Sequence, residues 1–231
     1  MVPCKSFQKA GHQELFTYWY KNHIPGEIHI PMTERGRPRA FDREEALAKA
    51  MQVFWSQGYE GASMGELTEA MGINKPSLYA AFGCKEALFR EAVQYYNSVE
   101  CIALSQALQN EPTARAAIEA VLRINAGTYV SSGTPPGCMI VVASMRGAEE
   151  NAEVRSFLMK MRKDGQLGLA ERIERGIRDK DVPAKADAAK LAAYYTTVIH
   201  GLSIQALDGA SAQELQSIVD CAMASWDTLV R

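Results

Sequence analysis

The chain has 231 residues, 47% of them hydrophobic, and its 25 basic and 27 acidic side chains leave a formal net charge of −2. The apolar fraction supports a sizeable buried core and excludes wholesale disorder. No run of about 18 apolar residues is present, which excludes a predicted transmembrane helix and a membrane partner. The five cysteines form no C-x-x-C pair, a pattern typical of reduced cytoplasmic thiols. Because the total charge is near zero, a nucleic-acid-binding region would have to be a local concentration of basic residues.

Residues 1–31 differ from the rest of the chain. They contain three of the four histidines, show no sustained helical period, and end before Met32, a plausible alternative start. We expect this stretch to be an extension that is disordered or results from an upstream start codon. Cys4 with His12, His23 and His29 matches no standard zinc spacing, so no metal site is predicted.

From residue 42 onward the sequence predicts helices separated by short breaks. Asp42 and Glu45 mark the start of a first helix that ends at Gly58, and Ser63 with Glu66 forms a capping box for a second. Further helices are predicted at about 74–82, 85–109, 112–131, 138–148, 152–178, 185–208 and 211–229.

No segment keeps a convincing period of two. The best strand candidate, residues 139–142, is short and sits inside a longer helical pattern. The predicted fold class is therefore all-α, with three small helices feeding a larger helical bundle.

The most informative stretch is 63–82, which reads SMGELTEAMGINKPSLYAAF. Two short helices joined at Gly72 make either a helix-turn-helix or a plain αα-hairpin in a helical core. In the first case Leu78 faces inward, and Lys75, Ser77 and Tyr79 point outward, where they can reach base edges or phosphates.

Basic residues flank this stretch on both sides. Arg35, Arg37 and Arg39 lie on a Gly- and Pro-containing arm that can follow phosphates or enter a minor groove. Lys85 begins the long predicted helix, where a lysine and a helix N-terminus can hold a phosphate together. This local concentration of positive charge favours the DNA-binding interpretation.

Residues 40–92 resemble the TetR/AcrR family of bacterial transcriptional regulators, most specifically in Lys75-Pro76-Ser77-Leu78-Tyr79 followed by Phe82 and Lys85. The preceding arm, residues 34–39, is also common in that family. The other matching residues are Phe54, Gly58, Tyr59, Ser63, Met64, Leu67, Ala70, Gly72, Ile73, Leu88 and Phe89.

The resemblance implies a DNA-binding domain at 32–84, with its motif at 63–82, and a helical effector-binding and dimerisation domain at 85–231. It implies a homodimer formed through 185–208 and 211–229. It further implies repression at a pseudo-palindromic operator in double-stranded DNA until a small-molecule effector binds. The implied DNA contacts are Lys75, Ser77 and Tyr79, with Ser63 and Lys85 holding phosphate. No cofactor is implied.

Two residues depart from the usual pattern. Thr68 stands four residues before the turn glycine, where alanine is usual, and is small enough to fit. Cys84 takes the cap position of the long helix, where Ser, Asn or Asp is more usual. A thiol at a helix N-terminus beside Lys85 favours the reactive thiolate. A redox-responsive regulator acting through Cys84 is therefore an alternative hypothesis, against a tolerated substitution with ordinary reactivity.

Two further function classes compete with a regulator. Residues 61–65 fit G-x-S-x-G, the nucleophile elbow of serine hydrolases, but the residues before Ser63 continue a helix and His200 is the one histidine downstream. The other alternative is a helical interaction protein that has lost DNA binding. The outward-pointing residues Lys75, Ser77 and Tyr79 argue against a loss of DNA binding. We therefore predict a non-enzymatic regulator.

Aromatic and methionine side chains in the larger region are candidates for lining an effector pocket, against the simpler interpretation that they are core. Such a pocket would suit a small, largely apolar effector. The candidates are Tyr129, Met139, Met145, Phe157, Met161, Tyr194 and Tyr195.

Apolar faces on the last two predicted helices, 185–208 and 211–229, are predicted to pair with their copies in an isologous dimer. The alternative is that both faces are internal core of one protomer. The apolar face of helix 185–208 comprises Ala188, Leu191, Ala192, Tyr195, Val198, Ile199 and Leu202. The apolar face of helix 211–229 comprises Leu215, Ile218, Ala222, Ser225 and Leu229.

Overall fold

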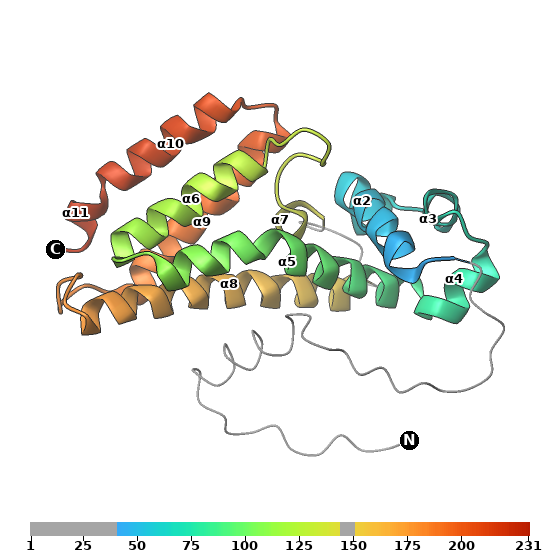
Figure 1. Cartoon of the computed structure of the whole chain (residues 1–231), viewed down its shortest axis with the longest axis horizontal. Coiled ribbons are helices and arrows are strands. Elements are labelled where there is room, and N and C mark those ends of the chain that lie inside the picture. The colour runs from blue at the N-terminus through green and yellow to red at the C-terminus, as the bar shows by residue number, and fades with distance from the viewer. Residues whose placement is uncertain (1–40, 144–150) are drawn as a thin grey trace, which may run out of the picture. The chain divides into compact units, whose positions relative to one another are not determined.

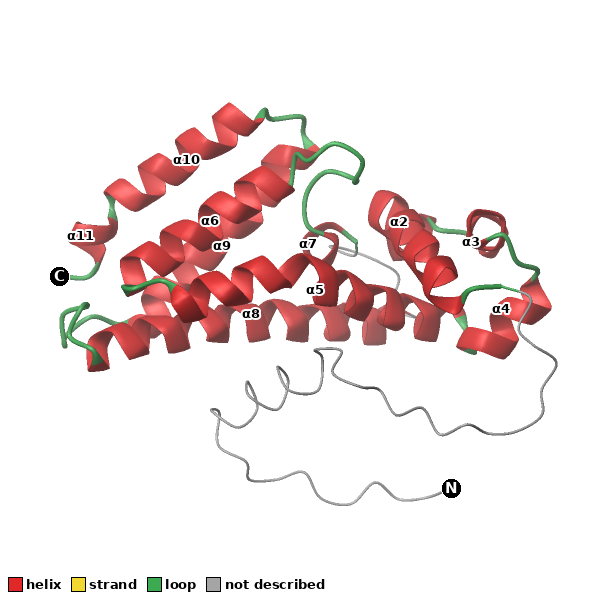
Figure 2. Ribbon diagram, viewed as in Figure 1, coloured by secondary structure: helices red, strands yellow, loops and turns green. Residues whose placement is uncertain are grey.

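The computed structural model describes residues 41–143 and 151–231, and its regular secondary structure there is entirely helical (Figures 1 and 2). In chain order the helices are α2 (Arg43–Gly61), α3 (Met64–Met71), α4 (Lys75–Phe82), α5 (Lys85–Asn110), α6 (Ala114–Thr128), α7 (Met139–Val142), α8 (Ala152–Arg178), α9 (Ala188–Leu207), α10 (Ala212–Ala224) and α11 (Trp226–Leu229). The all-α prediction is confirmed. Within the described ranges, no helix is long and apolar enough to cross a bilayer.

The helices begin where the sequence supplies a cap. A side-chain oxygen accepts a backbone N–H of the first turn at Asp42, Ser63, Asn74, Thr113, Asp187 and Ser211. Each such bond satisfies a donor that the helix itself leaves unpaired. At the start of α5 the acceptor is the sulfur of Cys84, 3.4 Å from the Ala87 nitrogen.

Two predicted helices differ from the structure. The strand candidate at 139–142 forms the short helix α7, and the rest of the helix predicted at 138–148 lies largely outside the described residues. The single helix predicted at 211–229 is divided at Ser225 into α10 and α11. The Ser225 hydroxyl donates to the Ala222 carbonyl at 2.7 Å, a local bond that competes with continuation of the helix.

Buried side chains form two hydrophobic cores. The N-terminal core gathers α2, α3, α4, the first half of α5, α7 and the start of α8. Phe54 and Phe89 are fully buried at its centre, with ring centroids 5.0 Å apart in an edge-to-face arrangement. Because this core includes α7 and part of α8, the helix-turn-helix motif is joined to the larger helical region through α2, which packs against α7, and through α5.

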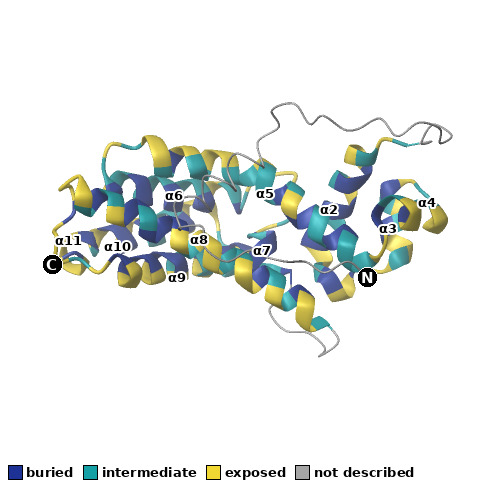
Figure 3. Ribbon diagram, turned by 90° about the horizontal axis from the view of Figure 1, so that it is seen from below, coloured by how far each residue is buried: buried dark blue, intermediate teal, exposed yellow. Residues whose placement is uncertain are grey.

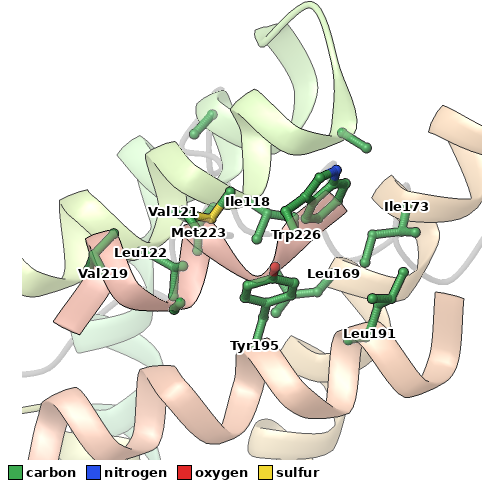
Figure 4. Close-up of a cluster of buried hydrophobic side chains, with 14 of the residues drawn as sticks. Ile118, Val121, Leu122, Leu169, Ile173, Leu191, Tyr195, Val219, Met223 and Trp226 are labelled. Carbon is green, nitrogen blue, oxygen red and sulfur yellow. The ribbon is translucent and has the colours of Figure 1, made fainter. Parts of the chain in front are cut away.

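The C-terminal core fills the space between α6, α8, α9 and α10 (Figure 4). Tyr195 on α9 is fully buried there and lies 5.7 Å from the ring of Trp226 on α11. Ile118, Leu122 and Ile173 complete the wall around it.

The apolar faces assigned to the dimer are mostly internal. Leu191, Ala192, Tyr195 and Leu202 of α9 are buried in the C-terminal core of one protomer, as is Leu215 of α10. The prediction that these residues meet a second copy was therefore wrong. Periodicity reveals that a helix face is buried and does not reveal which partner covers it. Both helices also carry an exposed side, visible in Figure 3.

Candidate nucleic-acid interface

The turn between α3 and α4 spans three residues and depends on Gly72. Gly72 has φ 67° and ψ 30°, in the left-handed region that glycine adopts without strain. Its N–H donates to the Glu69 carbonyl, and the next N–H, of Ile73, donates to the Thr68 carbonyl. These bonds close the end of α3 and direct the chain into α4.

Helix α4 presents the predicted set of side chains. Asn74 accepts the Ser77 N–H at 2.9 Å to start it, and Pro76 occupies a first-turn position that needs no donor. Leu78 is fully buried and Phe82 nearly so, which turns the opposite side toward solvent.

Lys75 and Tyr79 lie one turn apart on α4, beside its buried side, and both are accessible to solvent. Lys75 is exposed, Tyr79 is 49% exposed, and Ser77 is half-buried. The structure thus places these three side chains on one short helix whose buried side is fixed. Their contact with DNA stays a prediction.

Ser63 is held as a helix cap. Its hydroxyl accepts the Glu66 N–H at 3.2 Å, and its own N–H donates to the Glu66 carboxylate at 2.9 Å. The Ser63 hydroxyl and then the Ser63 N–H lower the pKa of Glu66 by hydrogen bonding to its charged form. A nucleophile elbow requires a strand before the serine, whereas here helix α2 precedes it, so the hydrolase alternative loses its structural basis.

Lys85 begins α5 as predicted, but its side chain lies against an aromatic ring. Its Nζ is 4.6 Å from the centroid of Tyr59, a cation–π contact. Burial lowers the pKa of Lys85, with the carboxylate of Glu60 acting in the opposite direction. Its phosphate-binding role stays a prediction, as does the redox role of the exposed Cys84 beside it.

Arg43 has a positioning role that sequence reasoning missed. Its guanidinium lies 4.4 Å from the centre of the Phe82 ring and 2.6 Å from a carboxylate oxygen of Glu91. It therefore ties the end of α4 to α2 and α5. No local pattern signals this contact, because Glu91 is 48 residues away in sequence.

Two sets of predicted residues lie outside the described part of the chain. One is the basic arm with Arg35, Arg37 and Arg39, and the other is the pocket candidate Met145. The possible cluster of Cys4 with three histidines also lies there. Within the described residues, no group of three metal-ligating side chains is close enough to hold an ion.

The structure divides the described pocket candidates between the two cores and does not bring all of them to one site. Met139 and Tyr129 are buried in different cores, and Tyr195 lies in the C-terminal core. Phe157 and Met161 pack at the edge of the N-terminal core, where Arg90 lies 4.8 Å from the centre of the Phe157 ring. Tyr194 is 37% exposed, and its hydroxyl is 3.3 Å from the Ser225 hydroxyl.

A partly open cavity of about 370 Å³ lies between α7, α8 and α9, and none of those candidates lines it. Its lining residues are Val141, Arg162, Thr197, His200, Gly201 and Ile204. Arg162 donates to the Ile140 carbonyl at 2.8 Å, and burial, followed by the charge of Arg162, lowers the pKa of His200. Sequence reasoning missed this cavity because it searched for aromatic and methionine side chains.

Two short helices joined by a glycine turn, the second with one buried side, have the arrangement of a helix-turn-helix, a motif of DNA-binding proteins. Residues 46–92 match the family model of bacterial regulatory proteins of the tetR family. The chain is 32% identical over 202 residues to the HTH-type transcriptional repressor ComR of Escherichia coli K12, covering 85% of this chain and 94% of that protein. The chain belongs to the TetR family of transcriptional regulators.

Other relatives agree with this assignment. The HTH-type transcriptional repressor BdcR of Escherichia coli K12 is 30% identical over 190 residues, covering 82% of this chain and 89% of BdcR. Among solved structures, a cysteine mutant of the TetR family transcriptional regulator CifR, complexed with 26bp double-strand operator DNA, is 44% identical with a TM-score of 0.81. That alignment covers 82% of this chain and all of the CifR chain.

Proposed function

We propose that the protein is a ligand-responsive repressor that binds a pseudo-palindromic operator in the cytoplasm as a homodimer and leaves it when a small effector binds. The observation that carries the proposal is that α4, held in place by the buried Leu78 and Phe82, leaves Lys75 and Tyr79 exposed and Ser77 half-buried. The names of ComR and BdcR as repressors, and the operator complex of CifR, support it.

The proposed mechanism is thermodynamic linkage without covalent catalysis. In a dimer the two α4 helices are set to enter successive major grooves, about 34–36 Å apart. An effector that binds more tightly to a conformation with another spacing of the two α4 helices lowers the affinity for DNA. The reduction cannot exceed the ratio of the effector's affinities for the two conformations.

The effector is proposed to be small and largely apolar. Val141 and Ile204 give the cavity beside α7 apolar walls, while Arg162, Thr197 and His200 supply a few polar positions. This combination is common in binding sites for small molecules, in which an apolar body provides affinity and a few polar contacts fix orientation. The tyrosines and methionines predicted from the sequence remain candidates for further contacts.

We expect Tyr79→Ala to weaken operator binding by about 1–3 kcal/mol, the usual cost of losing one good specific contact. Fluorescence anisotropy with double-stranded DNA from the region upstream of the gene measures this directly. Tyr79 is 49% exposed, so the substitution should leave the thermal unfolding midpoint nearly unchanged. Tyr79→Phe is the matched control, since it keeps the ring and removes the hydroxyl alone. Unchanged affinity in Tyr79→Ala would exclude the proposed contact.

We expect Ala193→Arg to convert the dimer to a monomer. Ala193 is a small residue on the exposed side of α9, outside the lining of the cavity, and its small size lets a second helix approach closely. In an isologous interface each introduced arginine would face the arginine of the other protomer, and the two like charges would repel each other. Sedimentation at micromolar concentration measures the change. Lys190→Arg, at the exposed start of α9, is the control, and a dimeric Ala193→Arg protein would exclude this face.

A further inference from the structure

The cavity between α7, α8 and α9 has the guanidinium of Arg162 in its lining. One N–H of this group donates to the Ile140 carbonyl of α7 at 2.8 Å. A guanidinium carries five N–H donors. Within residues 41–143 and 151–231, Arg162 makes no other hydrogen bond and no ion pair. Its half-buried side chain therefore has unused donors for a molecule that enters the cavity.

The charge of Arg162 acts inside the cavity. Burial lowers the pKa of His200, and the second cause of this lowering is the positive charge of Arg162. With a lowered pKa, His200 is mainly a neutral imidazole at pH 7, which donates one N–H and accepts at its other nitrogen. The cavity thus combines a guanidinium that lacks an acidic partner among the described residues with a neutral histidine that can add one hydrogen bond.

The rest of the lining suits an uncharged, apolar group. The Thr197 hydroxyl donates to the Ala193 carbonyl at 2.8 Å, so its proton is already used within α9. Val141 and Ile204 supply aliphatic walls. A Cβ added at Gly201 would meet no atom within 4 Å, which shows that the space beside this residue is open. The donors of the cavity are therefore restricted to the side where Arg162 and His200 lie.

We propose that the cavity binds a small organic acid, with its carboxylate paired to Arg162 and hydrogen-bonded by His200, and with its apolar body against Val141 and Ile204. The proposal names the chemical class of the effector, and its consequence for DNA binding rests on the proposed repressor function. A guanidinium recognises a carboxylate specifically, because two parallel N–H groups can donate to the two oxygens. A neutral ligand of the same shape would leave the charge of Arg162 without a partner.

Arg162 also holds α7, which gives the acid a route to the DNA-binding helices. The segment 137–143 accepts hydrogen bonds from α2 at both ends, from the Trp55 indole at 3.2 Å and from the Tyr59 N–H at 3.0 Å. A charge-assisted bond to a carboxylate is about twice as strong as a bond to a neutral carbonyl. A bound acid would therefore compete with the Ile140 carbonyl for Arg162 and loosen α7 from α8, while α7 stays bonded to α2.

Calorimetric titration of the full chain at pH 7, without DNA, tests the ligand class. The probes are benzoate and hexanoate, each compared with its own amide, which has the same apolar body and no charge. We expect each acid to bind at least about tenfold more tightly than its amide, because a hydrogen bond to a charged group contributes that much. Equal binding of acid and amide, or no binding of either acid, would overturn the proposal.

Substitutions of α8 test the site. Arg162→Gln removes the charge and keeps an amide N–H for the Ile140 carbonyl, so it should lower the affinity for benzoate to that for benzamide. Lys163→Gln removes the same charge from the neighbouring exposed position and should bind benzoate like the unsubstituted protein. Arg162→Lys, which keeps the charge, should have intermediate affinity and serves if the glutamine variant does not fold. Unchanged benzoate affinity in either Arg162 variant would overturn the site.

A DNA-binding measurement separates the site from the repressor function. We expect saturating sodium benzoate to lower the affinity for DNA from upstream of the gene by about 5- to 150-fold, the usual range of coupling between sites. Sodium chloride at equal concentration is the control, because salt alone weakens DNA binding. The Lys163→Gln protein should respond to benzoate, and the Arg162→Gln protein should not. Unchanged DNA binding by the benzoate-bound protein would overturn the coupling, whereas failure of the acid-free protein to bind DNA would instead overturn the proposed repressor.

Discussion

Phe54→Ala is expected to lower the free energy of unfolding by about 3–5 kcal/mol, the usual cost of replacing a fully buried phenylalanine by alanine. Phe54 is 0% exposed and forms an edge-to-face pair with Phe89, at 5.0 Å, and a stacked pair with Tyr59, at 6.3 Å. Its removal leaves a cavity at the centre of the N-terminal core. Chemical denaturation followed by circular dichroism measures the loss.

Val99→Ala on the surface of α5 is the control for this substitution. Val99 is 50% exposed, so its truncation should change stability by no more than about 0.5 kcal/mol. If both variants unfold at the denaturant midpoint of the unsubstituted protein, Phe54 does not have the buried position described above.

Gly137→Ala is expected to destabilise the protein by about 1–3 kcal/mol through steric overlap, with a further ~1 kcal/mol from the left-handed backbone. Gly137 has φ 78°, and a Cβ added there would lie 2.7 Å from the Ser203 carbonyl oxygen. The backbone around Gly137 would have to move away from α9, which would also strain the hydrogen bond that the Trp55 indole donates to the Gly137 carbonyl at 3.2 Å. Thermal unfolding measures the destabilisation.

Gly133→Ala separates the two contributions to this effect. Gly133 also has a positive φ, 92°, but a Cβ added there would meet no atom within 4 Å. Its substitution should therefore lower the free energy of unfolding only by the ~1 kcal/mol that the left-handed backbone costs. Equal destabilisation of the two variants would show that the close approach of Gly137 to Ser203 contributes nothing.

The sequence predicted the features of the fold that depend on neighbouring residues. Capping residues such as Ser63 and Asn74, and the turn at Gly72, act over three or four positions, so they can be recognised in the chain itself. The same holds for the exposure of Lys75 and Tyr79, since Leu78 and Phe82 on the same short helix are its buried residues.

Features that join distant segments could not be predicted in this way. The Arg43–Glu91 pair and the Trp55–Gly137 bond connect residues 48 and 82 positions apart. The apolar periodicity of α9 correctly marked a buried side, but only the packing of Tyr195 against Trp226 shows that the same protomer covers it. The cavity around Arg162 likewise depends on three helices meeting, which no local pattern encodes.

Helix α5 contributes to both cores without interruption, with Tyr96 in the N-terminal core and Ala107 in the C-terminal core. No residue along it is therefore a natural point of cleavage between two self-sufficient pieces. A fragment cut before α5 would lose Leu88, Phe89 and Val93, all fully buried in the N-terminal core. The DNA-binding part of this chain therefore cannot be transferred to another protein by itself. A chimaeric protein would have to include α5 as well.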